Sequence, residues 1–74
     1  MLKTIQVNGR FVALSESNHE FLVDSLSQAT PFSPRIADAL TNTHEAQPIA
    51  RIVTRLRNLG IDVPESAVVE VSDL

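Results

Sequence analysis

Five polar side chains in the second half of the chain are able to hydrogen-bond to phosphates or to the edges of bases. Gln47, Arg51, Arg55 and Asn58 follow one another at spacings of four, four and three residues, with Thr54 beside them. This spacing places them on one face of a helix. Arginine can bind guanine through two hydrogen bonds, glutamine or asparagine can do the same with adenine, and threonine can bond to base edges or phosphate. The pattern therefore predicts a face suited to anionic or base-like groups.

The same face has a simpler interpretation as the polar outer side of an ordinary surface helix. The cations are also few, since Arg35, Arg51, Arg55 and Arg57 supply only four candidate phosphate or base contacts. Strong DNA-binding proteins make about 6 to 10 phosphate contacts. We therefore expect a monomer to bind DNA with modest affinity, and we expect that affinity to fall quickly as the salt concentration rises. Either a homodimer adds contacts, or the partner is not DNA.

An apolar stripe on the other side of this helix indicates that it packs on a core. The apolar residues recur at three- and four-residue spacing: Ile49, Ile52, Val53, Leu56 and Leu59. Asn42 or Thr43 is predicted to cap the helix, and Pro48 to lie in or before its first turn. Gly60 is predicted to end it as a left-handed cap.

Two shorter helices are predicted before this one. Ser17 and Glu20 have the spacing of a capping box, in which the hydroxyl and the carboxylate both bond to free backbone N–H groups at a helix start. We therefore expect a first helix over residues 18 to 28. Ser33 followed by Pro34 predicts a second helix over residues 34 to 40, because serine caps and proline loses no hydrogen bond at the first helical position.

The chain begins with a predicted β-hairpin. Asn8-Gly9 separates two β-prone runs and supplies the positive φ angles of a type I′ turn, which pairs Val7 with Arg10 and Ile5 with Val12. Strand alternation then places four apolar residues on the core side: Ile5, Val7, Val12 and Leu14. Phe11 falls on the outer side, where Leu2 and Phe11 are candidates for a small apolar interface.

The pattern changes again after Gly60. Two short β-prone runs follow, separated by Pro64-Glu65-Ser66-Ala67, and they predict either a second small hairpin or a single strand that joins the first one. The expected fold is therefore α+β, as a single small winged-helix-like domain over residues 1–74. Its expected parts are a hairpin (1–14), three helices (17–60) and a short acidic wing or tail (61–74).

Charge and composition narrow the class of protein. The 74 residues are 43% hydrophobic and carry a formal net charge of -3, which suits a small folded domain. The last 14 residues contain four acidic and no basic side chains, so the rest of the chain is near neutral. The chain has no cysteine, and its sequence contains no apolar run long enough to span a membrane and no apolar core of a signal peptide. The sequence therefore predicts a protein of the cytoplasm with no membrane partner. A core this small supplies little stability alone.

The sequence gives little support for a catalytic site or a metal-binding site. The two histidines, His19 and His44, are far apart in sequence and have no cysteine to complete a metal site. The serines fit caps and turns, and two glycines cannot form a glycine-rich phosphate loop. We therefore expect no enzyme, no cofactor and no small-molecule substrate.

Two segments resemble a known family. "VNGRFVALSESNHEFL" is similar to the strand-then-helix lead of OmpR/PhoB-type winged helix-turn-helix domains, and "RIVTRLRNLG" is similar to the end of their recognition helix. The likeness covers most of residues 3 to 63. It implies that the third helix enters the major groove. The positions that would then face DNA are Gln47, Arg51, Thr54 and Arg55, with Arg57 and Arg35 nearer its backbone.

The leading hypothesis is a small transcription regulator that binds duplex DNA through the third helix. The alternative is a phage-type regulatory protein whose arginine face binds a protein of the transcription machinery, such as RNA polymerase. The acidic C-terminal segment favours the alternative, because it repels nucleic acid.

Overall fold

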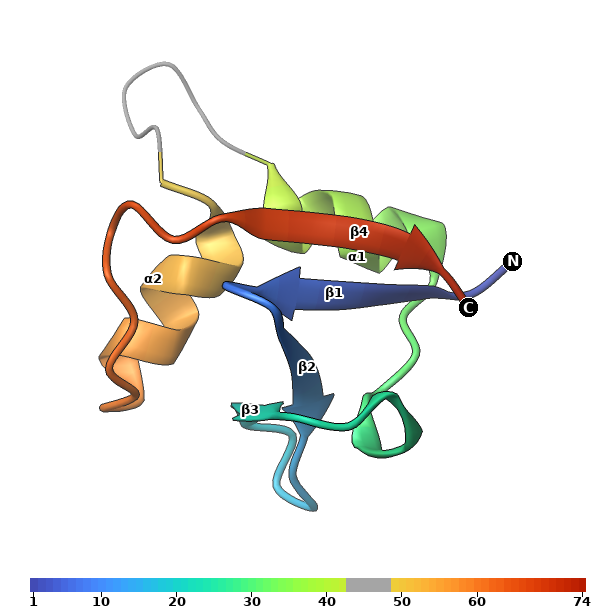
Figure 1. The fold of residues 1–74 in the computed structure, drawn as a ribbon, viewed down its shortest axis with the longest axis horizontal. Coiled ribbons are helices and arrows are strands. Elements are labelled where there is room, and N and C mark those ends of the chain that lie inside the picture. The colour runs from blue at the N-terminus through green and yellow to red at the C-terminus, as the bar shows by residue number, and fades with distance from the viewer. Residues whose placement is uncertain (43–48) are drawn as a thin grey trace.

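The computed structural model describes residues 1–42 and 49–74. It is α+β, with an antiparallel sheet of four strands in the order β3-β2-β1-β4. Figure 1 shows β1 and β4 side by side, with β2 leaving β1 at a steep angle. The elements, in chain order, are β1 (Lys3–Val7), β2 (Arg10–Leu14), β3 (Glu20–Val23), the short 3₁₀ helix η1 (Leu26–Gln28), α1 (Pro34–Thr41), α2 (Arg51–Asn58) and β4 (Val69–Asp73).

The N-terminal hairpin forms as the sequence predicts. Asn8 and Gly9 have φ angles of 51° and 82°, as a type I′ turn requires. Val7 pairs with Arg10, as predicted, and Gln6 pairs with Phe11. The pairing stops there, so the predicted pair of Ile5 with Val12 does not form. The predicted core side is also correct, because Ile5, Val7 and Val12 are buried and Leu14 packs against them.

The predicted arrangement of three helices with a wing is wrong. The segment expected to form the first helix instead contains β3, which pairs with β2 from Leu14↔Glu20 to Phe11↔Val23, followed by η1. Asn18 has a φ of 62°, which a helix does not accept. Ser15 closes the turn through bonds to the backbone of His19. Cross-strand packing of the β-prone run Glu20–Val23 therefore overrides its local capping signal.

Residues 30 to 32 fill the space that opens between β1 and β2. The Thr30 N–H donates to the Val12 carbonyl at 3.2 Å, and the Thr30 hydroxyl accepts from the Leu14 N–H at 2.8 Å. Phe32 exchanges two backbone hydrogen bonds of 2.8 Å with Lys3. The chain thus continues the pairing of β1 after β2 has turned away.

The second predicted helix is confirmed as α1. The Ser33 hydroxyl accepts a hydrogen bond from the Ile36 N–H at 3.3 Å, and Pro34 is the first helical residue. Asn42 does not cap the following helix as predicted. It terminates α1, with its N–H donating to the Asp38 carbonyl.

The basic helix is shorter than its apolar pattern indicates. α2 begins at Arg51, so Ile49 lies before it, and Gly60 follows its end with a φ of 84°. That left-handed residue lets the Ile61 N–H return to the Leu56 carbonyl at 3.0 Å, as in a glycine C-cap. Thr43 and Pro48, also assigned to the start of this helix, lie outside the described residues.

The C-terminal segment is a single strand that joins the hairpin, one of the two predicted alternatives. β4 pairs with β1 over five positions, from Lys3↔Asp73 to Val7↔Val69. Asn8 also exchanges two bonds of 2.8 Å with the backbone of Val68. The acidic end of the chain therefore completes the sheet instead of projecting as a wing.

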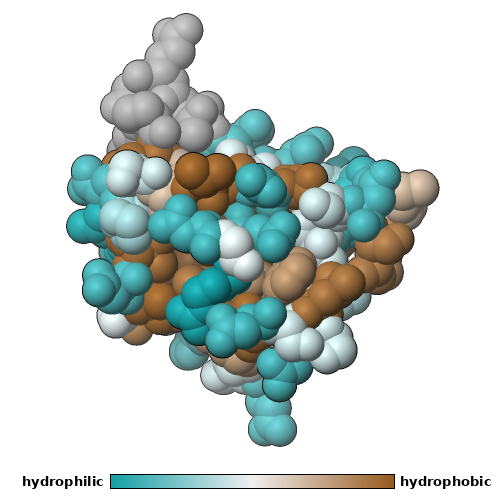
Figure 2. Space-filling model, in the orientation of Figure 1, coloured by the Kyte–Doolittle hydropathy of each residue, from teal (hydrophilic) through white to brown (hydrophobic). Residues whose placement is uncertain are grey.

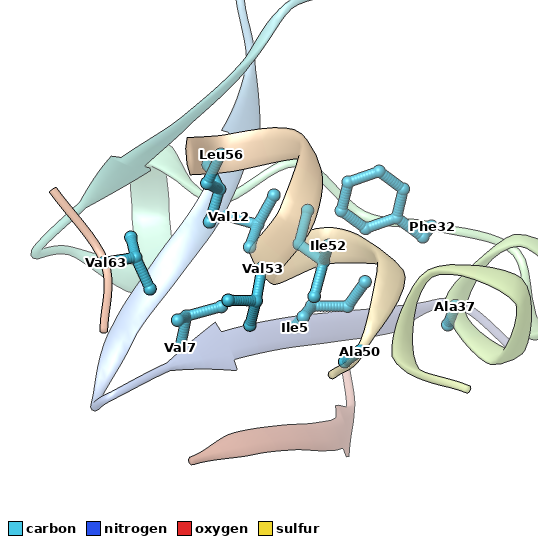
Figure 3. Packing of buried hydrophobic residues seen from close by; sticks show 10 residues of the cluster. All are labelled: Ile5, Val7, Val12, Phe32, Ala37, Ala50, Ile52, Val53, Leu56 and Val63. Atoms are coloured by element: carbon cyan, nitrogen blue, oxygen red, sulfur yellow. The ribbon is translucent and has the colours of Figure 1, made fainter. Parts of the chain in front are cut away.

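The core lies between the sheet and the two helices. In Figure 3, Ile5, Val7 and Val12 of the hairpin face Ile52, Val53 and Leu56 of α2. Phe32, Ala37, Ala50 and Val63 complete the buried cluster. Leu59, predicted to share this stripe, is 42% exposed instead, because the helix ends at Asn58.

Candidate partner-binding surface on the second helix

The outer face of α2 carries most of the polar residues that the sequence singled out. Arg51, Thr54 and Asn58 are exposed and lie opposite the buried Ile52, Val53 and Leu56. Arg55 and Arg57 are also exposed and flank this line on its two sides, as their positions in a 3.6-residue repeat require. The predicted face therefore exists from Arg51 to Asn58. Gln47 lies outside the described residues.

Arg55 is held by a carboxylate of the sheet. Its Nε donates to Oε1 of Glu20 at 2.8 Å, and its Nη2 lies 2.7 Å from the same oxygen in an ion pair. The Glu20 side chain is only 6% exposed, and its Oε2 has no hydrogen-bond partner among the described residues. β3 thus supplies a buried acceptor that fixes the near edge of the guanidinium.

Arg57 is paired on the opposite side of the helix. Its Nη1 lies 3.5 Å from Oε1 of Glu65, in the turn before β4. Both side chains are well exposed, at 43% and 66%. This contact is looser than the Arg55–Glu20 pair and is screened by water.

These two pairs reduce the positive charge of the helix. Three arginines on α2 and two carboxylates, Glu20 and Glu65, sum to 3 - 2 = +1. Arg35 is exposed but belongs to the first turn of α1, so it is not part of this face. The face is therefore far less basic than its sequence indicates.

The two residues of the predicted apolar interface lie in different surroundings. Phe11 is half-buried on the outer side of β2, opposite Val23, and the 39%-exposed Phe21 is its diagonal neighbour. Leu2 is 46% exposed and lies beside Leu74, whose N–H donates to its carbonyl at 3.0 Å. Figure 2 shows apolar side chains at the edge of the molecule where, in Figure 1, both termini lie.

A hollow of about 210 Å³ lies between the start of β3 and the end of α2. It is lined by His19, Glu20, Arg55, Asn58 and Leu59. Nδ1 of His19 is 3.4 Å from the Ser17 hydroxyl. Arg55 and Asn58, one turn apart on α2, therefore share a concave surface with the loop that precedes β3.

Sequence reasoning missed the acidic residues of this surface. The sequence predicts Glu20 in a helix cap and Glu65 between two β-prone runs, and neither prediction places a carboxylate beside α2. The one available signal was the position of Glu20 in an otherwise apolar, β-prone run. A charged residue facing inward from such a strand needs a partner, and arginine is the usual one.

Comparisons with protein-family models, with curated proteins and with solved structures find no match to this chain. Within residues 1–42 and 49–74, no group of three acidic or histidine side chains is placed to hold a metal ion. No helix in this part of the chain is long and apolar enough to cross a membrane.

Proposed function

We propose that this protein is a small regulatory protein that binds another protein, with the outer face of α2 as part of the contact surface. The observation that carries this proposal is the ion pairing of two of the three arginines on α2. Arg55 and Arg57 have carboxylate partners, so the helix and its acidic neighbours together carry a charge of +1. Recognition of a protein surface needs a few well-placed charges and not a high positive potential.

The same observation weakens the case for DNA. Each phosphate contact depends on a cation that is free to neutralise it, and Arg55 and Arg57 would have to share their charge with Glu20 and Glu65. The exposed Asp62 and Glu65 follow α2 directly, so phosphates approaching its C-terminal end meet negative charge. The basic pattern of α2 therefore supports a mixed-charge protein contact better than a DNA contact.

Duplex DNA stays the second candidate because one structural observation favours it. Arg51, Thr54 and Asn58 are all exposed along one line of α2, and these side-chain types can read base edges. On this alternative the protein is a transcription regulator that uses this line, and its affinity falls steeply with salt.

A pull-down with tagged protein, with and without nuclease, tests the proposal. Capture of a specific protein that survives nuclease and weakens in Arg51→Glu supports it. Capture that disappears with nuclease, together with tight binding to mixed duplex DNA at low salt, would refute it in favour of the DNA candidate. Arg35→Glu, on the other helix, is the matched control for a change in total charge.

A further inference from the structure

Asn8 and Gly9, in the hairpin turn, form the one asparagine–glycine pair of the sequence. Both residues are exposed, and a Cβ atom added at Gly9 would meet no atom within 4 Å. In such a pair the backbone nitrogen of the glycine can attack Cγ of the asparagine, because no side chain shields that nitrogen. The other asparagines, Asn18, Asn42 and Asn58, precede larger residues. The turn is therefore the position in this chain best suited to deamidation.

Deamidation makes and breaks a defined set of bonds. The Gly9 nitrogen loses its proton and bonds to Cγ of Asn8, the Cγ–Nδ2 bond breaks, and the amide nitrogen leaves as ammonia with that proton. The product is a succinimide ring, which water then opens at one of its two carbonyl carbons. Opening at Cγ leaves aspartate, and opening at the backbone carbonyl carbon leaves isoaspartate, whose main chain runs through Cβ and Cγ. Both products carry a carboxylate in place of the neutral amide.

The folded protein holds Asn8 away from this reaction. Its Oδ1 atom accepts a hydrogen bond from the Val68 N–H at 2.8 Å, and its own N–H donates to the Val68 carbonyl at 2.8 Å. The side chain must leave this bond and rotate before Cγ reaches the Gly9 nitrogen. Ring closure also forces a new ψ angle on Asn8, whereas the turn holds this residue in the left-handed region. Attack therefore requires the contact with Val68 to open.

This contact lies where the sheet opens most easily. Val68 precedes β4 and is 60% exposed, so its bonds to Asn8 are at the end of the β1–β4 ladder and next to water. Hydrogen bonds at such ends open at a much lower free energy than those of the core. We propose that Asn8 is a site of spontaneous deamidation and that its contact with Val68 sets the rate.

Deamidation should in turn weaken the attachment of β4. Isoaspartate lengthens the main chain of a two-residue turn, so the native register of Val7 with Arg10 is lost. Either product adds a carboxylate to the hollow of about 170 Å³ that Asn8 and Asp62 both line, where like charges repel. Arg10 lines the same hollow but is already paired with Asp24. Modified molecules should therefore unfold at lower urea concentration than unmodified ones.

Peptide mapping by mass spectrometry over time tests the proposal on the wild-type protein. One sample is kept in native buffer and one in guanidinium chloride at the same pH, and an isoaspartyl methyltransferase assay separates the two products. We expect conversion of Asn8 in both samples, with the slower rate in native buffer. If Asn8 is intact in native buffer once the unfolded sample is fully converted, it is not a site of the folded protein and the proposal fails. Equal rates in the two samples would show that the fold does not set the rate.

Two variants at one position test the role of Val68. Val68→Pro removes the N–H that bonds to Oδ1 but keeps the carbonyl, so we expect roughly 2- to 10-fold faster deamidation, as loss of one hydrogen bond implies. Val68→Ala keeps both groups and should react as the wild type does. Equal rates for the two variants would overturn the control by Val68.

Hydrogen exchange gives a second measurement that does not depend on the folding of Val68→Pro. The opening constant of the Val68 N–H in the wild type, multiplied by the deamidation rate of the unfolded chain, should reproduce the rate in native buffer. A native rate far above or far below this product would show that another motion controls the reaction, and would overturn the proposal.

Discussion

Arg55→Ala should destabilise the fold, although Arg55 is an exposed residue on a polar helix face. The substitution removes both the hydrogen bond and the ion pair that Arg55 gives to Glu20, whose side chain is only 6% exposed. Removing one partner of a fully buried ion pair costs roughly 3 to 5 kcal/mol. Arg55 is 49% exposed, so its loss admits water to the carboxylate, and we expect a smaller cost of about 2 kcal/mol.

For a domain of this size, about 2 kcal/mol corresponds to a fall in Tm of roughly 8 to 16 °C. The chain has no tryptophan or tyrosine, so unfolding is best followed by far-ultraviolet circular dichroism during urea and thermal denaturation. Arg57→Ala is the control, because its pair with the 66%-exposed Glu65 should contribute below about 1 kcal/mol. Equal, small effects of both substitutions would show that Glu20 does not depend on Arg55.

Three further predictions concern the fold, each checked by the same denaturation measurements. Leu56→Ala removes a fully buried side chain of α2 and should cost about 2 to 5 kcal/mol; an unchanged midpoint would contradict the packing in Figure 3. Asn8→Ala should cost about 1 to 3 kcal/mol, because it loses the bond to Val68 and places alanine at a positive φ; Asn8→Gly should cost less. Deletion of residues 69–74 removes every partner on one side of β1 and should abolish cooperative unfolding, whereas a retained transition would show that the sheet is stable without β4.

The features predicted correctly from the sequence are those that neighbouring residues determine. Asn8-Gly9 specifies its turn because few other residues accept positive φ, and Ser33-Pro34 specifies the start of α1 through a bond three residues away. Gly60 ends α2 for a similar reason. The buried side of α2 follows from the spacing of Ile52, Val53 and Leu56. Each of these signals is local, so no knowledge of the rest of the chain is needed.

The features that were missed depend on contacts between distant segments. Glu20 has the spacing of a helix cap, but β2 offers it a strand pairing and α2 offers it Arg55, 35 residues away. The position of Glu20 in an apolar, β-prone run indicates that the carboxylate needs a partner, but not that Arg55 is that partner. The neutralisation of the arginine face was missed for the same reason, since Glu65 reaches Arg57 only after the chain has turned at Gly60. The charge of the α2 surface is therefore less predictable than the core behind it.

The pairing of β1 with β4 also limits when this protein can finish folding during its synthesis. β1 is an inner strand of the sheet, yet Lys3 and its partner Asp73 are 70 residues apart. A growing chain on the ribosome has made the hairpin and both helices before β4 exists. During that interval one side of β1 is an open edge with free N–H and C=O groups, which other nascent chains can pair with. Completion of the native sheet must therefore wait until β4 has left the ribosome, so we expect the sheet to close only after residues 69–73 have been synthesised.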